Sequence, residues 1–189
     1  MTKYNCSLAK LKTVALDYLR KAGLSGEQIQ ALETLGYFEA PASKRNHLAY
    51  PGGLVEHSLH VTDNLLALKA FENETSSYRV GMLHDLVKVF VYKKDTDGVC
   101  YEKQASCYPG HGVASVLHIE DLGVDLSNAE KQAIIWHMGG FAVTDRALND
   151  AYDQAKLRFP REIVLTHAAD HLAAAEEEAD AAKEDDSNG

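Results

Sequence analysis

The chain is poor in cysteine and proline, with three cysteines and four prolines among its 189 residues. Because Cys6, Cys100 and Cys107 show no CxxC spacing, we expect reduced thiols, with a Cys100–Cys107 disulfide as the open alternative. No apolar run is long enough to cross a bilayer, and residues 1–10 lack an apolar stretch of the signal-peptide type. These absences predict a cytoplasmic protein.

Basic residues are fewer than acidic ones, 19 against 28, so the formal net charge at pH 7 is −9. Residues 176–189 hold −6 of this charge, which leaves −3 for the rest of the chain. A mildly acidic body argues against stable binding of duplex nucleic acid, which requires clustered Lys and Arg. A small anionic substrate such as a nucleotide, or a short single-stranded oligonucleotide in a local basic pocket, remains compatible with this charge.

Apolar periodicity of the helical kind dominates the sequence, and we expect an all-α fold. Ser25 with Gln28, and Ser127 with Glu130, have the spacing of capping boxes, and Ser76 or Ser77 is the expected cap of a further helix. The predicted helices cover residues 8–22, 26–35, 53–71, 77–88, 112–122, 129–138, 145–158 and 160–178.

One small β-hairpin is predicted, with strands at residues 89–94 and 99–103 joined by a turn at 95–98. The length suits one domain with a sizeable core. That domain is expected over residues 1–179, with N-terminal helices at 1–35, a core at 36–178 and a disordered acidic tail at 180–189.

The most informative pattern is an ordered set of histidines and aspartates on separate segments. Imidazole and carboxylate are ligands of borderline and hard divalent metals. A lone histidine is most often a surface or core residue, but an ordered set is far more specific. If the fold brought the set together, it could hold two metal ions. Its members are His57, His84, Asp85, His111, His137 and Asp170, with Lys88 close behind the His-Asp pair.

The residues around these positions sharpen the pattern. The runs are NHLAYPGGLVEHS at 46–58, GMLHDLVK at 81–88, YPGHG at 108–112, IWHMGG at 135–140 and THAAD at 166–170. From about residue 36 to 175, the chain resembles the HD-domain superfamily of metal-dependent phosphohydrolases, whose fold is a helical bundle. It is most similar to the HD-domain 3′-to-5′ exoribonucleases, which share the His-x-Ala-Tyr-x-Gly-Gly-Leu-x-x-His run, and to small single-domain bacterial and phage HD proteins.

One departure from the family pattern is Val87, which stands where many members have Gly in His-Asp-x-Gly-Lys. A β-branched residue fits a helix, so we expect the helix that carries His84 and Asp85 to continue through this position.

The resemblance implies a ligand set and a chemistry. His57, His84, Asp85 and Asp170 match the ligands of a first metal, and Asp85 would bridge to a second metal held by His111 and His137. The metals, one or two divalent ions of Mn, Fe, Ni, Co or Zn, would activate a hydroxide that attacks phosphorus. Asp85 and Lys88 would be catalytic, and Lys88 would contact substrate phosphate. The candidate substrate-binding residues are Lys88, Lys44, Arg45 and His47.

Other side chains are expected to be structural. Tyr50, Trp136 and Met138 are expected to pack. The remaining histidines are predicted to be polar residues near helix surfaces, although each could orient a ligand. They are His60, His118, His167 and His171.

Two alternatives to hydrolysis stay open at this point. The same six ligands serve a di-iron oxygenase in some HD-type proteins, and a nucleotide sensor could keep the metal in a structural role. The oligomeric state, including a homo-oligomer, is also open.

Overall fold

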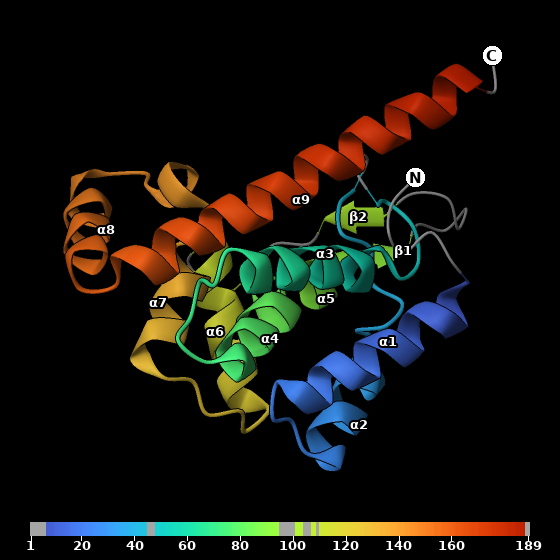
Figure 1. The fold of residues 1–189 in the computed structure, drawn as a ribbon, viewed down its shortest axis with the longest axis horizontal. Helices are drawn as coiled ribbons and strands as arrows, with labels where there is room; N and C mark the ends of the chain where they lie inside the picture. Colours follow the sequence, from blue (N-terminus) through green and yellow to red (C-terminus); the bar gives the residue numbers. More distant parts are fainter. Residues whose placement is uncertain (1–6, 45–47, 95–100, 104–106, 109, 188–189) are drawn as a thin grey trace.

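The computed structural model describes residues 7–44, 48–94, 101–103, 107–108 and 110–187. Over these residues the protein is built from α-helices, as predicted, with one pair of three-residue strands. Figure 1 shows α9 lying across the bundle above α3, with α1 and α2 at the opposite side. The helices are α1 (Leu8–Lys21), α2 (Gly26–Thr34), α3 (Gly53–Ala67), α4 (Glu74–Leu83), α5 (Lys88–Val91), α6 (His111–Asp121), α7 (Asn128–Ile135), the 3-10 helix η1 (Gly139–Ala142), α8 (Arg146–Arg158) and α9 (Pro160–Ser187).

Two helix starts form as their sequences predict. Both Ser25 and Ser127 make reciprocal capping boxes, with Gln28 and Glu130 respectively. The predicted cap of α4 is wrong, because the side chain of Asn73 accepts the backbone N–H of Ser76 and the helix begins at Glu74. Asn is as good an N-cap as Ser, so Asn73 can begin the helix three residues before Ser76.

The helix that carries the His-Asp pair ends earlier than predicted. α4 stops at Leu83, His84 is its C-cap, and the short helix α5 begins only at Lys88. Side chains occupy the carbonyls of the last turn, since His84 Nδ1 donates to Gly81 O (2.9 Å) and the Tyr37 hydroxyl donates to Met82 O (2.5 Å). These donors satisfy carbonyls that the end of α4 leaves without an intrahelical partner.

Ser115 of α6 holds the backbone just beyond this break. Its buried hydroxyl accepts the backbone N–H of Val87 at 3.2 Å. The expectation that Val87 would continue the helix is therefore wrong. Tertiary hydrogen bonds determine the backbone conformation after Leu83, and the helix preference of the Val87 side chain does not.

Two glycines mark close contacts between the helices that carry the candidate ligands. A Cβ at Gly81 would lie 2.3 Å from Thr62 Oγ1, where α4 packs against α3. A Cβ at Gly112 would lie 2.3 Å from Ile134 O and 2.4 Å from Ile135 O, where α6 meets α7. Only glycine allows these approaches, which bring histidines of neighbouring helices within reach of one another.

α9 is longer than predicted. It was expected to end near residue 178, followed by a disordered tail from 180, but it is helical from Pro160 to Ser187 (Figure 1). A buried stripe with three- and four-residue spacing explains its path across the bundle. The stripe consists of Ile163, Thr166, Ala169, Ala173 and Glu177.

The strands β1 (Tyr92–Lys94) and β2 (Tyr101–Lys103) pair antiparallel in the region of the predicted hairpin. Residues 89–91 were assigned to the first strand, but they belong to α5. The turn at 95–98 lies outside the described residues.

Within the described chain, no helix is long and apolar enough to cross a membrane. Cys107 is an exposed free thiol, and Cys6 and Cys100 lie outside the described residues.

Candidate metal centre

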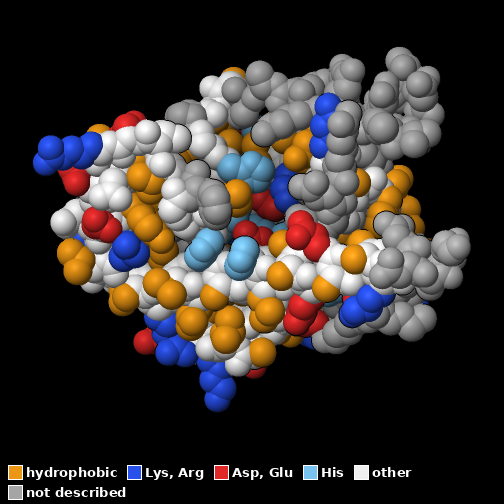
Figure 2. Space-filling model, turned by 90° about the horizontal axis from the view of Figure 1, so that it is seen from above, with side chains coloured by type: hydrophobic (Ala, Val, Ile, Leu, Met, Phe, Trp, Pro, Cys, Tyr) orange, Lys and Arg blue, Asp and Glu red, His pale blue; other side chains and the backbone are white. Residues whose placement is uncertain are grey.

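The six candidate ligands converge although their segments lie far apart in the sequence. They come from α3, the end of α4, the start of α6, the end of α7, and α9. Four of them are almost fully buried, whereas Asp170 is 16% exposed and His111 is 29% exposed. Figure 2 shows histidine side chains around a hollow, with acidic and basic side chains within it.

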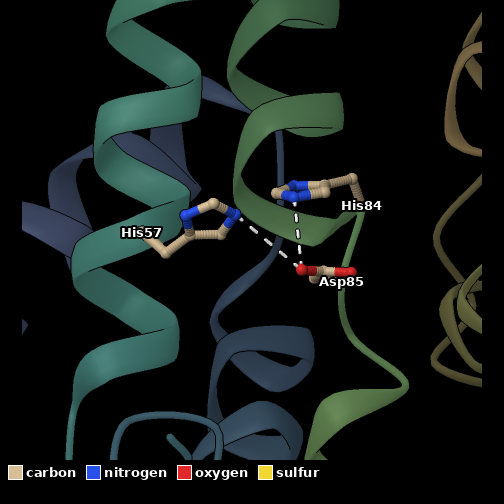
Figure 3. A group of neighbouring side chains, drawn as sticks. All are labelled: His57, His84 and Asp85. Carbon is tan, nitrogen blue, oxygen red and sulfur yellow. Dashed lines mark ion pairs between the residues drawn. The ribbon is translucent and has the colours of Figure 1, made fainter. Parts of the chain in front are cut away.

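The first group consists of His57, His84 and Asp85, whose potential ligand atoms all lie within 4.8 Å of one another. Both imidazoles face the Asp85 carboxylate from neighbouring helices (Figure 3). Asp85 Oδ2 is 3.9 Å from His57 Nε2 and 3.5 Å from His84 Nε2.

Asp170 completes this group from α9. Its Oδ1 is 3.0 Å from His57 Nε2 and 3.7 Å from His84 Nε2. Two ligands bound about 2.1 Å from one ion, at roughly tetrahedral or octahedral angles, lie about 3.0–3.4 Å apart. The observed separations are close to this range, so small movements would place these side chains around a single ion.

The second group consists of Asp85, His111 and His137. Asp85 Oδ1 accepts a hydrogen bond from His111 Nε2 at 2.6 Å and lies 3.3 Å from His137 Nε2. Asp85 therefore presents one oxygen to each group, as a carboxylate that bridges two ions would do.

Two buried nitrogens in the cluster lack hydrogen bonds. His84 and His137 donate their Nδ1 protons to the backbone carbonyls of Gly81 and Ile134, at 2.9 and 2.7 Å. Their Nε2 atoms are left facing the carboxylates without a hydrogen-bond partner in the described part of the chain. Buried polar atoms are rarely unpaired, and an unprotonated imidazole nitrogen is a metal ligand. The donor set therefore fits a divalent metal.

The electrostatics of the cluster favour bound cations. Burial raises the pKa of Asp85, but Lys88, His84 and His111 outweigh burial and hold this pKa well below its usual value. Burial likewise raises the pKa of Asp170, but the hydrogen bond with His57 and the nearby imidazole of His84 hold this pKa well below its usual value. Both carboxylates are therefore anionic at neutral pH.

A buried carboxylate missed in the sequence lies behind His57. Glu177 of α9 contacts His57 Nδ1 at 3.1 and 3.2 Å and His60 Nδ1 at 2.7 Å. Burial raises the pKa of Glu177, but hydrogen bonds with the two histidines lower it to about 2. In the sequence, Glu177 counted only toward the negative charge of residues 176–189 and was given no role in the site. Its signal was the seven-residue spacing from Asp170, which places both carboxylates on one helix face.

Of the expected substrate-binding residues, Lys88 lies in the site. Its ammonium contacts Asp85 Oδ2 at 2.5 Å, and its side chain is 12% exposed. Lys44 is exposed and follows Ser43, which lines the cavity. Arg45 and His47 lie outside the described residues.

A cavity of about 340 Å³ opens over the cluster. One wall includes His167 and His171, and the Nδ1 of His167 donates to His137 O at 2.7 Å. The residues that line the cavity are Ala42, Ser43, His57, Asp85, Lys88, Tyr92, His111, Met138, His167, Asp170, His171 and Ala174.

Some of the other side chains named from the sequence pack in the interior, and others line the cavity or form hydrogen bonds. Trp136 is buried and packs against Tyr152, as expected, whereas Met138 lines the cavity. The His118 ring stacks on Phe90 at 3.7 Å. The Tyr50 hydroxyl, which was expected mainly to pack, donates a hydrogen bond to Glu56 at 2.6 Å.

No protein-family model, curated protein or solved structure matches this chain. Its fold and site define an all-helical protein with a buried histidine and aspartate cluster that could bind metal.

Proposed function

We propose that this protein is a metal-dependent phosphohydrolase of the HD-domain type, acting on a phosphoester or phosphoanhydride bond of a nucleotide or short oligonucleotide. The observation that carries the proposal is the position of Asp85, which offers one oxygen to each histidine group while Lys88 contacts the same carboxylate. The order of these residues along the chain is that of the HD-domain pattern.

Six of the residues would bind metal, and Lys88 would bind substrate. His57, His84, Asp85 and Asp170 would hold one ion, and Asp85, His111 and His137 a second. The ions would supply an activated hydroxide and neutralise charge on the phosphoryl oxygens. Lys88, at the cavity wall, would contact a phosphoryl oxygen through its ammonium.

The size and charge of the cavity favour a small substrate. About 340 Å³ is at the lower end of the range for ligand pockets, so it suits a nucleotide or the end of a single strand. The net negative charge of the chain also argues against binding of a long nucleic-acid duplex.

Metal content is the first test. Purified wild-type protein should contain about two divalent metal equivalents, and the His111→Ala variant about one, because this change removes a ligand of the second group only. Elemental analysis of both proteins measures this. One equivalent or less in both proteins would indicate that only the first group binds metal.

Turnover is the second test. Metal-loaded protein is assayed against nucleoside mono- and triphosphates, cyclic dinucleotides and short RNA, with the Asp85→Asn variant as control. Release of phosphate or nucleotide by wild type alone supports the proposal, and no release from any substrate contradicts it. Substrate-dependent oxygen uptake by iron-loaded protein would instead indicate an oxygenase. Nucleotide binding without turnover would indicate a sensor.

A further inference from the structure

His57 differs from the other buried histidines of the centre because both of its ring nitrogens meet carboxylates of α9. Nε2 lies 3.0 Å from Asp170 Oδ1, and Nδ1 lies 3.1 and 3.2 Å from the two oxygens of Glu177. The two acids are two helical turns apart on α9, so one helix face holds the imidazole at both ends.

The Nδ1 protons of His84 and His137 go to backbone carbonyls three residues earlier in their own helices. A carbonyl is neutral, and its position is fixed by the local helix. Glu177 is charged and comes from a separate helix, and a carboxylate on the far nitrogen makes an imidazole a more basic ligand. His57 is therefore set apart from the other two by the charge of its Nδ1 partner.

Glu177 is itself held in place. It is 2% exposed, whereas its neighbours Glu176 and Glu178 are exposed. A buried carboxylate is costly unless it is paired, and Glu177 is paired with His57 and with His60 of α3. Because His60 binds Oε1 at 2.7 Å, the carboxylate has little freedom to turn away from His57.

We propose that Glu177 is a positioning residue for the metal centre, which fixes His57 with Nδ1 protonated and Nε2 directed at the metal. The inference rests on the metal centre of the proposed function, and it adds a residue outside the ligand set of the HD pattern. It also gives the distal part of α9 a role in metal binding.

The test compares the metal affinity of Glu177→Gln with that of wild type, using Glu176→Gln as the matched control. Competition with a chromophoric chelator measures the zinc dissociation constant of each full-length protein. Loss of a carboxylate behind a ligating histidine weakens metal binding by about 10- to 100-fold. We expect a loss in this range for Glu177→Gln and wild-type affinity for Glu176→Gln.

A second measurement does not depend on whether the variant folds. Nitrogen NMR of zinc-loaded wild-type protein should show His57 with a protonated, hydrogen-bonded Nδ1 and a metal-bound Nε2. Metal on Nδ1, or an unchanged dissociation constant in Glu177→Gln with only a lower melting temperature, would overturn the proposal. Neither readout requires turnover, so a zinc-binding protein that hydrolyses nothing would contradict the hydrolase and leave the role of Glu177 intact.

Discussion

At the scale of single residues, Asp85 organises the centre. It is 3% exposed, and its two oxygens meet the imidazoles of both groups and the ammonium of Lys88. Such a carboxylate is stable in the interior only because cationic or hydrogen-bonding partners surround it. The ammonium of Lys88 is one such partner in the structure, so a bound metal ion would compete with Lys88 for Asp85 Oδ2.

This competition predicts opposite effects of Lys88→Met on binding and on turnover. Removal of the ammonium should tighten metal binding by about tenfold, the low end of what one adjacent charge does to a carboxylate. Loss of a cation beside the transferred phosphoryl group should lower kcat by about 10²–10³-fold. Chelator competition and steady-state kinetics measure the two effects. Lys10→Met, at an exposed lysine of α1, should change neither, and weaker metal binding in Lys88→Met would contradict the argument.

The titration of His57 predicts how the stability of the metal-free protein depends on pH. Burial lowers the pKa of His57, but hydrogen bonds with Asp170 and Glu177 prevail and raise it to about 9 from 6.5. The contribution of protonated His57 to the free energy of unfolding is therefore fully present below about pH 6.5, and it is lost as the pH rises through about 9. The melting temperature of chelator-treated protein should fall across this window, and His57→Gln should show a smaller fall. A flat profile in wild type would contradict this.

At the scale of elements, close helix contacts set the ligand geometry. α4 ends at Leu83 beside α3, so His84 and Asp85 leave the helix where His57 faces them. In a longer α4, consecutive side chains would point about 100° apart, so His84 and Asp85 would less easily both face His57. The break after Leu83 is therefore part of the centre.

Gly81→Ala tests the contact between α3 and α4. The added methyl would lie 2.3 Å from Thr62 Oγ1 and 2.6 Å from Thr62 Cα, so the helices must separate. Overpacking of this kind costs about 1–3 kcal/mol, and the shift should also weaken metal binding. Denaturant unfolding and chelator competition measure the two effects. Gly26→Ala, where a Cβ has no neighbour within 4 Å, is the control, and equal behaviour of both variants would contradict the prediction.

At the scale of the whole molecule, bound metal would link segments that are remote in the sequence. Since an unfolded chain lacks the assembled site, free metal at about 100 times its dissociation constant should add about 2.7 kcal/mol of stability. For a chain of this length, that corresponds to about 5–10 °C in melting temperature. Chelation should lower the melting temperature of wild type by this amount, and added metal should restore it. Asp85→Asn should show no such shift, and a wild type insensitive to chelator would contradict the prediction.

The sequence by itself determined most of the helices and the identity of the candidate ligands. Apolar periodicity and capping boxes are local, so α2 and α7 begin where Ser25 and Ser127 predict. The order of histidines and aspartates along the chain also pointed to the clustered residues, because side-chain chemistry restricts metal ligands to a few residue types.

Only the tertiary structure decided where α4 stops, how far α9 extends and which side chains support the ligands. The end of α4 depends on hydrogen bonds from Tyr37 and to Ser115, which lie far away in the sequence. Glu177 reads locally as one of three consecutive glutamates in an acidic stretch. It becomes a buried partner of His57 because α9 packs against α3, and the pairing of charges between helices depends on packing that no local pattern encodes.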